Sequence, residues 1–323
     1  AGGDTASALA SGCPVVVKAH RSHPGTAELV GRAVVKAARE TGMPEGVFSL
    51  LHGQGSEVGT ALVKHPSTKA VGFTGSHAGG RALFDLAVSR SEPIPVYAEM
   101  GSLNPVFVLP GAMQTRAEEI AEGLHQSVTL GVGQFCTNPG LVFGLQDEPL
   151  DGMKAKLEGL FTEHAPETML NPGICDAYRA GVSALESAGG VALVGRTKAE
   201  PDRAKTEAAA HVFATDVATF SGSDVLNREV FGPSTVVVSC ATKDDMEQVA
   251  RGLDGHLTAT EIRALWRYTK TDTPVTSSKT CEAAGGAHYS HCAASGLHYC
   301  CEGVCDGKAT CSSKSGLLDC ACT

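Results

Sequence analysis

Short β-branched runs alternate with amphipathic stretches over residues 14–108, and this order leaves few architectures open. We predict strands at residues 13–18, 47–51, 70–74, 95–98 and 106–109. Helices are predicted from Thr26, as the capping residue, to about Gly42, from Glu57 to Lys64, and from Ser76 to about Arg90. Strands and helices that alternate at this spacing indicate a parallel sheet with helices on both faces. That architecture does not by itself specify a chemistry.

Two glycine-containing segments are candidates for phosphate binding. The segment 53–59 resembles a dinucleotide fingerprint, but it has one residue too many before its third glycine and follows the second predicted strand, so a structural turn is favoured. Gly75 and Ser76 are better placed, because a strand ends and a helix begins there, and the free N–H groups of a helix N-terminus attract a pyrophosphate. An ordinary serine N-cap explains the same two residues.

One cysteine stands out in a glycine-rich segment, 131–140. Cys136 lies there among close-fitting glycines and polar neighbours, a setting in which a thiolate can attack an electrophilic carbon. A buried structural cysteine is the alternative interpretation. The segment 96–105 lies upstream and places Glu99 at the end of a strand-like run, where a general base is easily held.

Composition separates the chain into two parts near residue 260. Of the 12 cysteines, four lie in residues 1–260 and eight follow, whereas all 10 phenylalanines lie before the break. We expect the tail, 261–323, to be irregular or disordered, because it lacks the apolar surface that offsets chain entropy. A shifted reading frame explains the abrupt change best; a zinc module would usually show a Cys-x-x-Cys pair, and a disulfide module conflicts with a thiol-dependent body.

Charge and hydropathy narrow the classes of partner. The net charge is −9 and the isoelectric point is near 5.7, which argues against nucleic acid or an anionic membrane surface as the main partner. No apolar run approaches the ~20 residues that span a bilayer. No metal site is predicted, since His20 and His23 have neither a carboxylate nor a cysteine nearby in sequence. We expect a cytoplasmic protein that acts on a small molecule.

Five segments, taken in order over residues 1 to about 260, resemble the aldehyde dehydrogenase superfamily. The resemblance implies that Cys136 is the catalytic thiol and Glu99 the general base. It also implies that Lys18 contacts the adenosine ribose, that Gly75 and Ser76 contact phosphate, that Glu229 holds the nicotinamide ribose and that Phe231 packs beside the nicotinamide ring. The amino-acid sequences of the segments 73–83, 98–105 and 133–140 are similar to those of one subgroup, the 2,5-dioxovalerate (α-ketoglutaric semialdehyde) dehydrogenases. Related NADP-dependent fatty aldehyde dehydrogenases share much of this sequence.

The resemblance also bears on cofactor choice. NAD-preferring relatives usually carry a glutamate three positions after the lysine, and here that position holds Arg21. A cation there favours the 2′-phosphate of NADP, so NADP is the expected cofactor and NAD is possible. Arg21 could instead be an ordinary solvated side chain.

The implied mechanism is covalent. Cys136 attacks the aldehyde, hydride leaves to the nicotinamide, and Glu99 activates the water that hydrolyses the thioester. The family's second oxyanion donor is an asparagine upstream of the first residue here, and its loss can cost ~10²–10³ in rate. The chain begins inside a predicted helix at 4–11, so we expect a fragment. A homo-oligomer is expected for the full-length protein and uncertain for the fragment.

The sequence therefore predicts an α/β protein with three parts. Residues 1–103 are a partial dinucleotide-binding domain, 104–260 a partial catalytic domain and 261–323 the cysteine-rich tail. The predicted activity is NAD(P)-dependent oxidation of an aldehyde to a carboxylate. A catalytically silent NAD(P)-binding fragment is the alternative, and a metal- or redox-binding protein acting through the tail is a third hypothesis.

Overall fold

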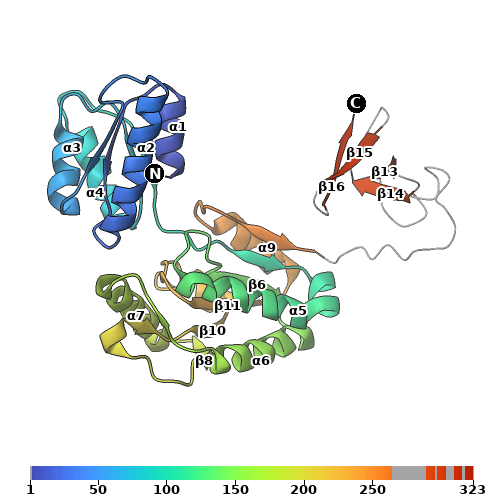
Figure 1. Ribbon diagram of the computed structural model, residues 1–323. Coiled ribbons are helices and arrows are strands. Elements are labelled where there is room, and N and C mark those ends of the chain that lie inside the picture. Colours follow the sequence, from blue (N-terminus) through green and yellow to red (C-terminus); the bar gives the residue numbers. More distant parts are fainter. Residues whose placement is uncertain (1, 264–288, 295–296, 303–308, 315–316, 323) are drawn as a thin grey trace. The chain divides into compact units, whose positions relative to one another are not determined.

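The computed structural model describes residues 2–263, 289–294, 297–302, 309–314 and 317–322. The chain divides into two units, residues 1–264 and 265–323. Mixed helices and strands dominate the first unit (Figure 1). No helix among the described residues combines the length and the apolar character that a membrane crossing requires.

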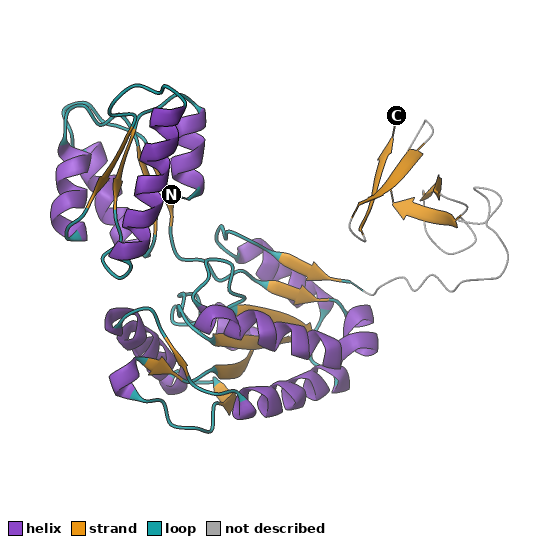
Figure 2. Cartoon of the chain, in the orientation of Figure 1, coloured by secondary structure: helices purple, strands orange, loops and turns teal. Residues whose placement is uncertain are grey.

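The N-terminal part of the first unit contains four short strands and four helices. In chain order these are α1 (Gly3–Ala10), β1 (Val15–Lys18), α2 (Pro24–Glu40), β2 (Phe48–Leu51), α3 (Thr60–Lys64), β3 (Val71–Thr74), α4 (His77–Val88) and β4 (Val96–Glu99). β1 pairs with β2 and β3 pairs with β4, both in parallel. Figure 2 shows α1 and α2 on one side of these strands and α3 and α4 on the other. The predicted parallel pairing with helices on both faces is confirmed.

Several details of this part differ from the prediction. The strands form two separate parallel pairs instead of one continuous sheet. Thr26 does not cap α2, because Pro24 already occupies the first turn and the residue before it, His23, makes no side-chain cap. Proline suits that position since its missing N–H is not needed there. The segment 55–59 forms a π-helical turn ahead of α3, so the helix predicted from Glu57 to Lys64 begins as an irregular turn.

The remaining part is built on a six-stranded sheet. Its strands and helices are β5 (Val106–Val108), α5 (Pro110–Thr129), β6 (Leu141–Leu145), α6 (Glu148–Glu163), β7 (Glu167–Thr168), α7 (Pro172–Ser187), β8 (Ala192–Arg196), β9 (Glu207–Ala208), β10 (His211–Asp216), α8 (Val217–Ser221), β11 (Ser234–Cys240), α9 (Lys243–Gly252) and β12 (Thr260–Ile262). The strand order is β12-β5-β6-β11-β10-β8. All neighbours are parallel except β8, which runs antiparallel to β10 at the edge.

Alternate residues of the sheet fill two hydrophobic cores. In β11, Val236 and Val238 enter the cluster that α7, α8 and α9 cover, whereas Val237 enters the one that α5 and α6 cover. This alternation follows from the two-residue repeat of a strand. The central strands are buried on both faces, which is why they read as continuous apolar runs. A sheet packed on both sides is a rigid platform for the loops at its ends.

The second unit contributes two antiparallel hairpins. β13 (Tyr289–Ala294) pairs with β14 (Leu297–Glu302), and β15 (Ala309–Lys314) pairs with β16 (Leu317–Cys322). These described strands differ from the irregular tail that the composition predicts. The rest of that prediction, together with the zinc and disulfide alternatives for the tail cysteines, falls outside the described residues and side chains.

Candidate active site

Cys136 lies in the loop between the helical turn Leu130–Gly133 and β6. The residue is exposed and its thiol is free. The alternative interpretation of Cys136 as a buried structural cysteine is therefore wrong. An accessible thiol meets the first requirement for a nucleophile, and its catalytic role stays a prediction.

The other described cysteines provide a contrast. Cys13 is also exposed and free, whereas Cys175 and Cys240 are fully buried. Burial raises the pKa of the Cys175 thiol, and it raises that of Cys240 to about 11. Neither buried thiol is a candidate nucleophile, because the reactive form is the thiolate and the thiol must be accessible.

The backbone ahead of Cys136 has an unusual conformation. Gly131, Val132 and Gly133 have φ values of +57°, +60° and +64°, three left-handed residues in a row. The conformation is ordinary for glycine, but it is rare and strained for a β-branched residue such as Val132. Strain of this kind persists only where the surroundings hold it, and it occurs often in active sites.

The Cys136 loop packs against the segment that holds Glu229 and Phe231. A β-carbon added to Gly133 would overlap the backbone of Gly232 and Pro233, so only glycine fits there. Asn138 donates its side-chain amide to the carbonyl of Gly232 at 2.8 Å. The structure thus brings together two of the segments that the sequence separates by about ninety residues.

Glu229 is held by the segment that follows β4. Its Oε1 accepts a hydrogen bond from the Ser102 N–H at 3.2 Å, and its Oε2 approaches Gly101. The residue is exposed overall, but its neighbours exclude water from the carboxylate, and this desolvation raises the pKa of Glu229. Phe231 is half-buried two residues further on.

Glu99 and the predicted phosphate turn lie side by side. Glu99 is the last residue of β4, its side chain is exposed, and its carbonyl accepts the Gly75 N–H at 3.0 Å. Gly75 therefore does not offer that N–H to a ligand. Ser76 caps α4 by accepting the Gly79 N–H at 3.2 Å, so the N-cap interpretation of this serine is confirmed. Glu99 and Cys136 are not joined by a direct hydrogen bond in the described part of the chain.

The N-terminus of α4 retains features that suit an anion. Within the described residues, the N–H groups of His77 and Ala78 make no hydrogen bond, as is usual in the first turn of a helix. A β-carbon on Gly80 would overlap the side chain of Met100, so a larger residue here would require Met100 to move. Free N–H groups and the helix dipole together favour a phosphate at this place.

Basic side chains gather where β1 ends. Lys18 is the last residue of β1 and its ammonium group lies beside Gly55. Arg21 follows in an exposed turn, and the rings of His20 and His23 stack with centroids 5.0 Å apart. Desolvation lowers the pKa of His20, and the neighbouring His23, Lys18 and Arg21 lower it further, so its imidazole is neutral at neutral pH. The permanent positive charges here belong to Lys18 and Arg21.

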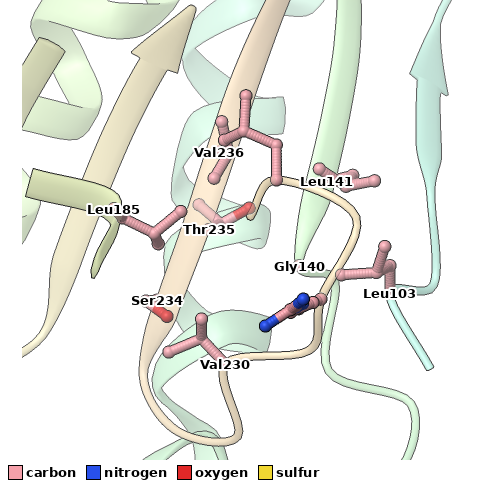
Figure 3. Close-up of a pocket in the computed structure, with 10 residues that line it drawn as sticks. Leu103, Gly140, Leu141, Leu185, Val230, Ser234, Thr235 and Val236 are labelled. Carbon is pink, nitrogen blue, oxygen red and sulfur yellow. The ribbon is translucent and has the colours of Figure 1, made fainter. Parts of the chain in front are cut away.

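Two small cavities lie beneath the 227–233 segment. One, of about 20 Å³, is lined mainly by aliphatic side chains with Leu141 and Leu185 on opposite sides, and Ser234 and Thr235 add hydroxyl groups (Figure 3). The other, of about 10 Å³, touches Asn138 and Glu229. Both volumes are near that of a single water molecule, so neither accommodates an aldehyde. The Oγ1 of Thr235 and the Oδ1 of Asn138 are buried without a protein partner, which suits a water at each place.

Sequence reasoning missed the polar side chains that support the site. Ser102, Asn104 and Asn138 are not predicted, although Asn104 bonds to the Cys136 loop, Asn138 bonds to the segment of Glu229, and the Ser102 hydroxyl donates to Asn104. The one available signal is that they lie within the segments 98–105 and 133–140.

Among the side chains that the structure describes, no group of three His, Cys, Asp or Glu residues is arranged to hold a metal ion.

Comparison with known proteins agrees with this geometry. Residues 1–269 match the model of the aldehyde dehydrogenase family. The chain is 48% identical over 260 residues to alpha-ketoglutaric semialdehyde dehydrogenase 2 of Azospirillum brasilense, covering 80% of this chain and 49% of that protein. It is 43% identical over 266 residues to the alpha-ketoglutaric semialdehyde dehydrogenase of Acinetobacter baylyi, covering 81% and 49%. The chain thus spans about half the length of these curated relatives.

Solved structures share the fold. An NAD-dependent benzaldehyde dehydrogenase from Corynebacterium glutamicum superposes with a TM-score of 0.65 at 23% identity, covering 80% of this chain and 55% of that one. A gamma-glutamyl-gamma-aminobutyraldehyde dehydrogenase from Burkholderia cenocepacia gives a TM-score of 0.67 at 22% identity, covering 80% and 51%. The α/β fold class is therefore confirmed. Because the family model matches residues 1–269 of the 323 residues, this chain belongs to the aldehyde dehydrogenase family.

Proposed function

We propose that the chain carries the thiol-bearing and cofactor-binding portion of an NADP-dependent aldehyde dehydrogenase whose substrate is α-ketoglutaric semialdehyde, also called 2,5-dioxovalerate. The observation that carries the proposal is the exposed free thiol of Cys136, which follows three left-handed residues. The substrate class rests on the names of the two relatives at 48% and 43% identity. The products are the corresponding dicarboxylic oxo-acid and the reduced cofactor.

The residues present fit a dinucleotide. Its pyrophosphate suits the N-terminus of α4, where His77 and Ala78 have free N–H groups. Lys18 would contact the adenosine ribose, and Arg21 would pair with a 2′-phosphate. Glu229 would accept hydroxyl groups of the nicotinamide ribose, and Phe231 would pack beside its ring. When bound, the cofactor supplies the acceptor for the hydride that leaves the substrate carbon.

Cys136 and Glu99 divide the remaining chemistry. The Cys136 thiolate forms a bond to the aldehyde carbon, and the carbonyl oxygen becomes an oxyanion to which the Cys136 backbone N–H donates. Loss of hydride from that carbon leaves a thioester on Cys136. Glu99 then takes a proton from water, and the hydroxide adds to the thioester. Cleavage of the carbon–sulfur bond releases the carboxylate and returns the thiolate.

Turnover by thiol variants tests this function. Formation of reduced cofactor from α-ketoglutaric semialdehyde is measured for the chain, for Cys136→Ala and for Cys13→Ala, which removes the other exposed thiol. We expect activity in the chain and in Cys13→Ala and none above background in Cys136→Ala. Equal activity of the two variants would contradict the assignment of the nucleophile.

A silent cofactor-binding portion is the second candidate, and the observation that favours it is that neither of the two cavities beside the 227–233 segment accommodates an aldehyde. Binding of NADP⁺ without turnover in either the chain or its variants would support this candidate. The two candidates share the cofactor site, so the binding measurement alone does not separate them.

Replacement of Arg21 tests the preference for NADP. Arg21→Glu puts a negative charge where a 2′-phosphate is proposed to bind, so the dissociation constant for NADP⁺ should rise about tenfold or more, as expected for a lost charge-assisted hydrogen bond. The NAD⁺ constant should change less than about threefold, because NAD⁺ lacks that phosphate. Arg39→Glu, near the end of α2, makes the same change of charge elsewhere. Similar effects of the two variants on NADP⁺ would show general electrostatics instead of a local contact.

We also propose a cytoplasmic location, because all four cysteines with described side chains are free. Reducing compartments keep thiols in that state, and a thiol nucleophile requires it.

A further inference from the structure

Asn104 is an unusual residue in the segment before β5. Its side chain is buried, with 2% of the residue exposed, and its φ is +46°. Asparagine is one of the few residues other than glycine that enter the left-handed region readily. The position therefore restricts which residues can stand here before any side-chain contact is considered.

The amide nitrogen of Asn104 holds the Cys136 loop. Nδ2 donates to the carbonyl of Cys136 at 2.8 Å and to the carbonyl of Asn138 at 2.9 Å. These two bonds use both amide hydrogens, and they fix the main chain on either side of Thr137. The carbonyl of the candidate nucleophile itself is one of the two anchors.

The amide oxygen of Asn104 is anchored from the other direction. Oδ1 accepts from Ser102 Oγ at 2.9 Å, from the Thr258 N–H at 3.2 Å and from Thr258 Oγ1 at 3.0 Å. The orientation of the amide is unambiguous, because carbonyls only accept and a backbone N–H only donates. Ser102 in turn accepts the Leu257 N–H through its hydroxyl at 2.9 Å. The side chain thus joins three segments that are distant in the sequence.

From these contacts we infer that Asn104 is the positioning residue of the Cys136 loop. Its hydrogen bonds link the 102–104 and 256–258 segments to the backbone carbonyls of Cys136 and Asn138 and so restrict their movement. Asn138 continues the connection to the Glu229 segment through the Gly232 carbonyl. Asn104 does not touch the reacting atoms, so its effect is on the place of the thiol and of the Cys136 N–H. The catalytic consequence rests on the proposed function, whereas the hold on the loop does not.

Two readouts test the two halves of the inference. Asn104→Gly keeps the left-handed backbone and removes the amide, and Asn104→Asp keeps the shape but has no N–H to donate when ionised. We expect backbone hydrogen exchange in residues 131–140 to accelerate about tenfold or more in both variants, since two hydrogen bonds are lost. We expect kcat to fall about 10²-fold with KM within about threefold, the cost of a slightly misplaced group.

Two control variants separate positioning from general destabilisation. Thr215→Val removes a buried hydroxyl whose Oγ1 bonds the Gly190 carbonyl at 2.9 Å, away from the Cys136 loop. Thr258→Val removes one donor to Oδ1 and leaves both Nδ2 bonds in place. Both controls should keep wild-type exchange in 131–140 to within about threefold.

The outcomes distinguish the possible failures. Unchanged exchange in 131–140 in both Asn104 variants would overturn the inference, whether or not the chain is active. Faster exchange in a chain without turnover would support the hold on the loop and count against the proposed function alone. Faster exchange with unchanged kcat would show that Asn104 holds the loop without positioning the thiol, and would overturn the catalytic half.

Discussion

At the residue scale, a few backbone positions decide whether the Cys136 loop can form. Gly133 has a φ of +64° and lies against the backbone of Gly232 and Pro233. Val132 takes a similar φ although it is β-branched, so the surrounding contacts have to offset its strain. These residues carry no titratable group, but they shape the backbone that leads to Cys136.

Substitution of Gly133 tests this point. Gly133→Ala adds a β-carbon that overlaps the backbone of Gly232 and requires an unfavourable φ, so we expect the free energy of unfolding to fall by about 2 kcal/mol or more. Gly123→Ala is the matched control, because Gly123 lies within α5 with nothing near its β-position. There alanine should raise the free energy of unfolding by about 0.5–1 kcal/mol. Urea unfolding curves measure both, and a neutral Gly133→Ala would contradict the described packing.

At the scale of elements, a polar contact ties α7 to β10 and β11 inside the hydrophobic core. The Tyr178 hydroxyl donates to the Ala209 carbonyl at 2.7 Å and lies 3.0 Å from His211 Nδ1. The Tyr178 ring also packs on Gly232, where a β-carbon would overlap it. Burial raises the pKa of Tyr178 and lowers that of His211 to about 4, so both groups are neutral at physiological pH. Through the packing of the Tyr178 ring on Gly232, this contact also holds the 227–233 segment in place.

This contact makes stability depend on pH. His211 takes up a proton near pH 6.5 in the unfolded state but only near pH 4 in the folded state. Between these two pH values the unfolded state therefore binds more protons than the folded state. The free energy of unfolding should therefore decrease by about 2 kcal/mol between pH 7 and pH 5 through this group. His211→Gln should remove that part of the dependence. Urea unfolding at both pH values measures it, with the exposed His65→Gln as control, and an unchanged slope in His211→Gln would refute the assignment.

At the scale of the whole molecule, the two parts of the first unit are packed very differently. Residues 104–262 form two large hydrophobic clusters on a six-stranded sheet. The strands of residues 2–100 form only pairs, and their one cluster consists of Val63, Ala87 and Ile94 with a few half-buried neighbours. Large apolar side chains there remain exposed, among them Leu29 at 71% and Tyr97 at 72%. Two-stranded sheets expose too much surface to complete a core alone.

Thiol reactivity reports on this fold as a whole. In the folded chain an alkylating reagent should modify Cys13 and Cys136, which are exposed, and leave Cys175 and Cys240 unmodified. The two buried cysteines should react only after urea unfolds the chain, because the thiolate must form in contact with water. Peptide mass spectrometry assigns each site and separates these residues from the tail cysteines. Native labelling of Cys240 at a rate similar to that of Cys13 would show that its part of the sheet is open.

The sequence by itself determined the order of strands and helices over residues 4–109, the family and the positions of the residues with chemical character. These features are local: β-branched runs, caps such as Ser76, and motifs such as the one around Cys136 are written in neighbouring residues. The predicted roles in binding and catalysis of the candidate site residues stay predictions; these are Cys136, Glu99, Lys18, Arg21, Gly75, Ser76, Glu229 and Phe231. A homo-oligomeric full-length protein also stays a prediction.

Only the tertiary structure decided how these residues are supported. Asn104 meets the Cys136 carbonyl and Thr258 through contacts that span more than thirty and more than one hundred and fifty residues, and no local pattern records them. The division of the first strands into two pairs and the burial of Cys175 and Cys240 were likewise invisible in the sequence. The physical reason is that hydrogen-bond partners and burial depend on which segments meet in space, whereas propensity and capping act within a few residues.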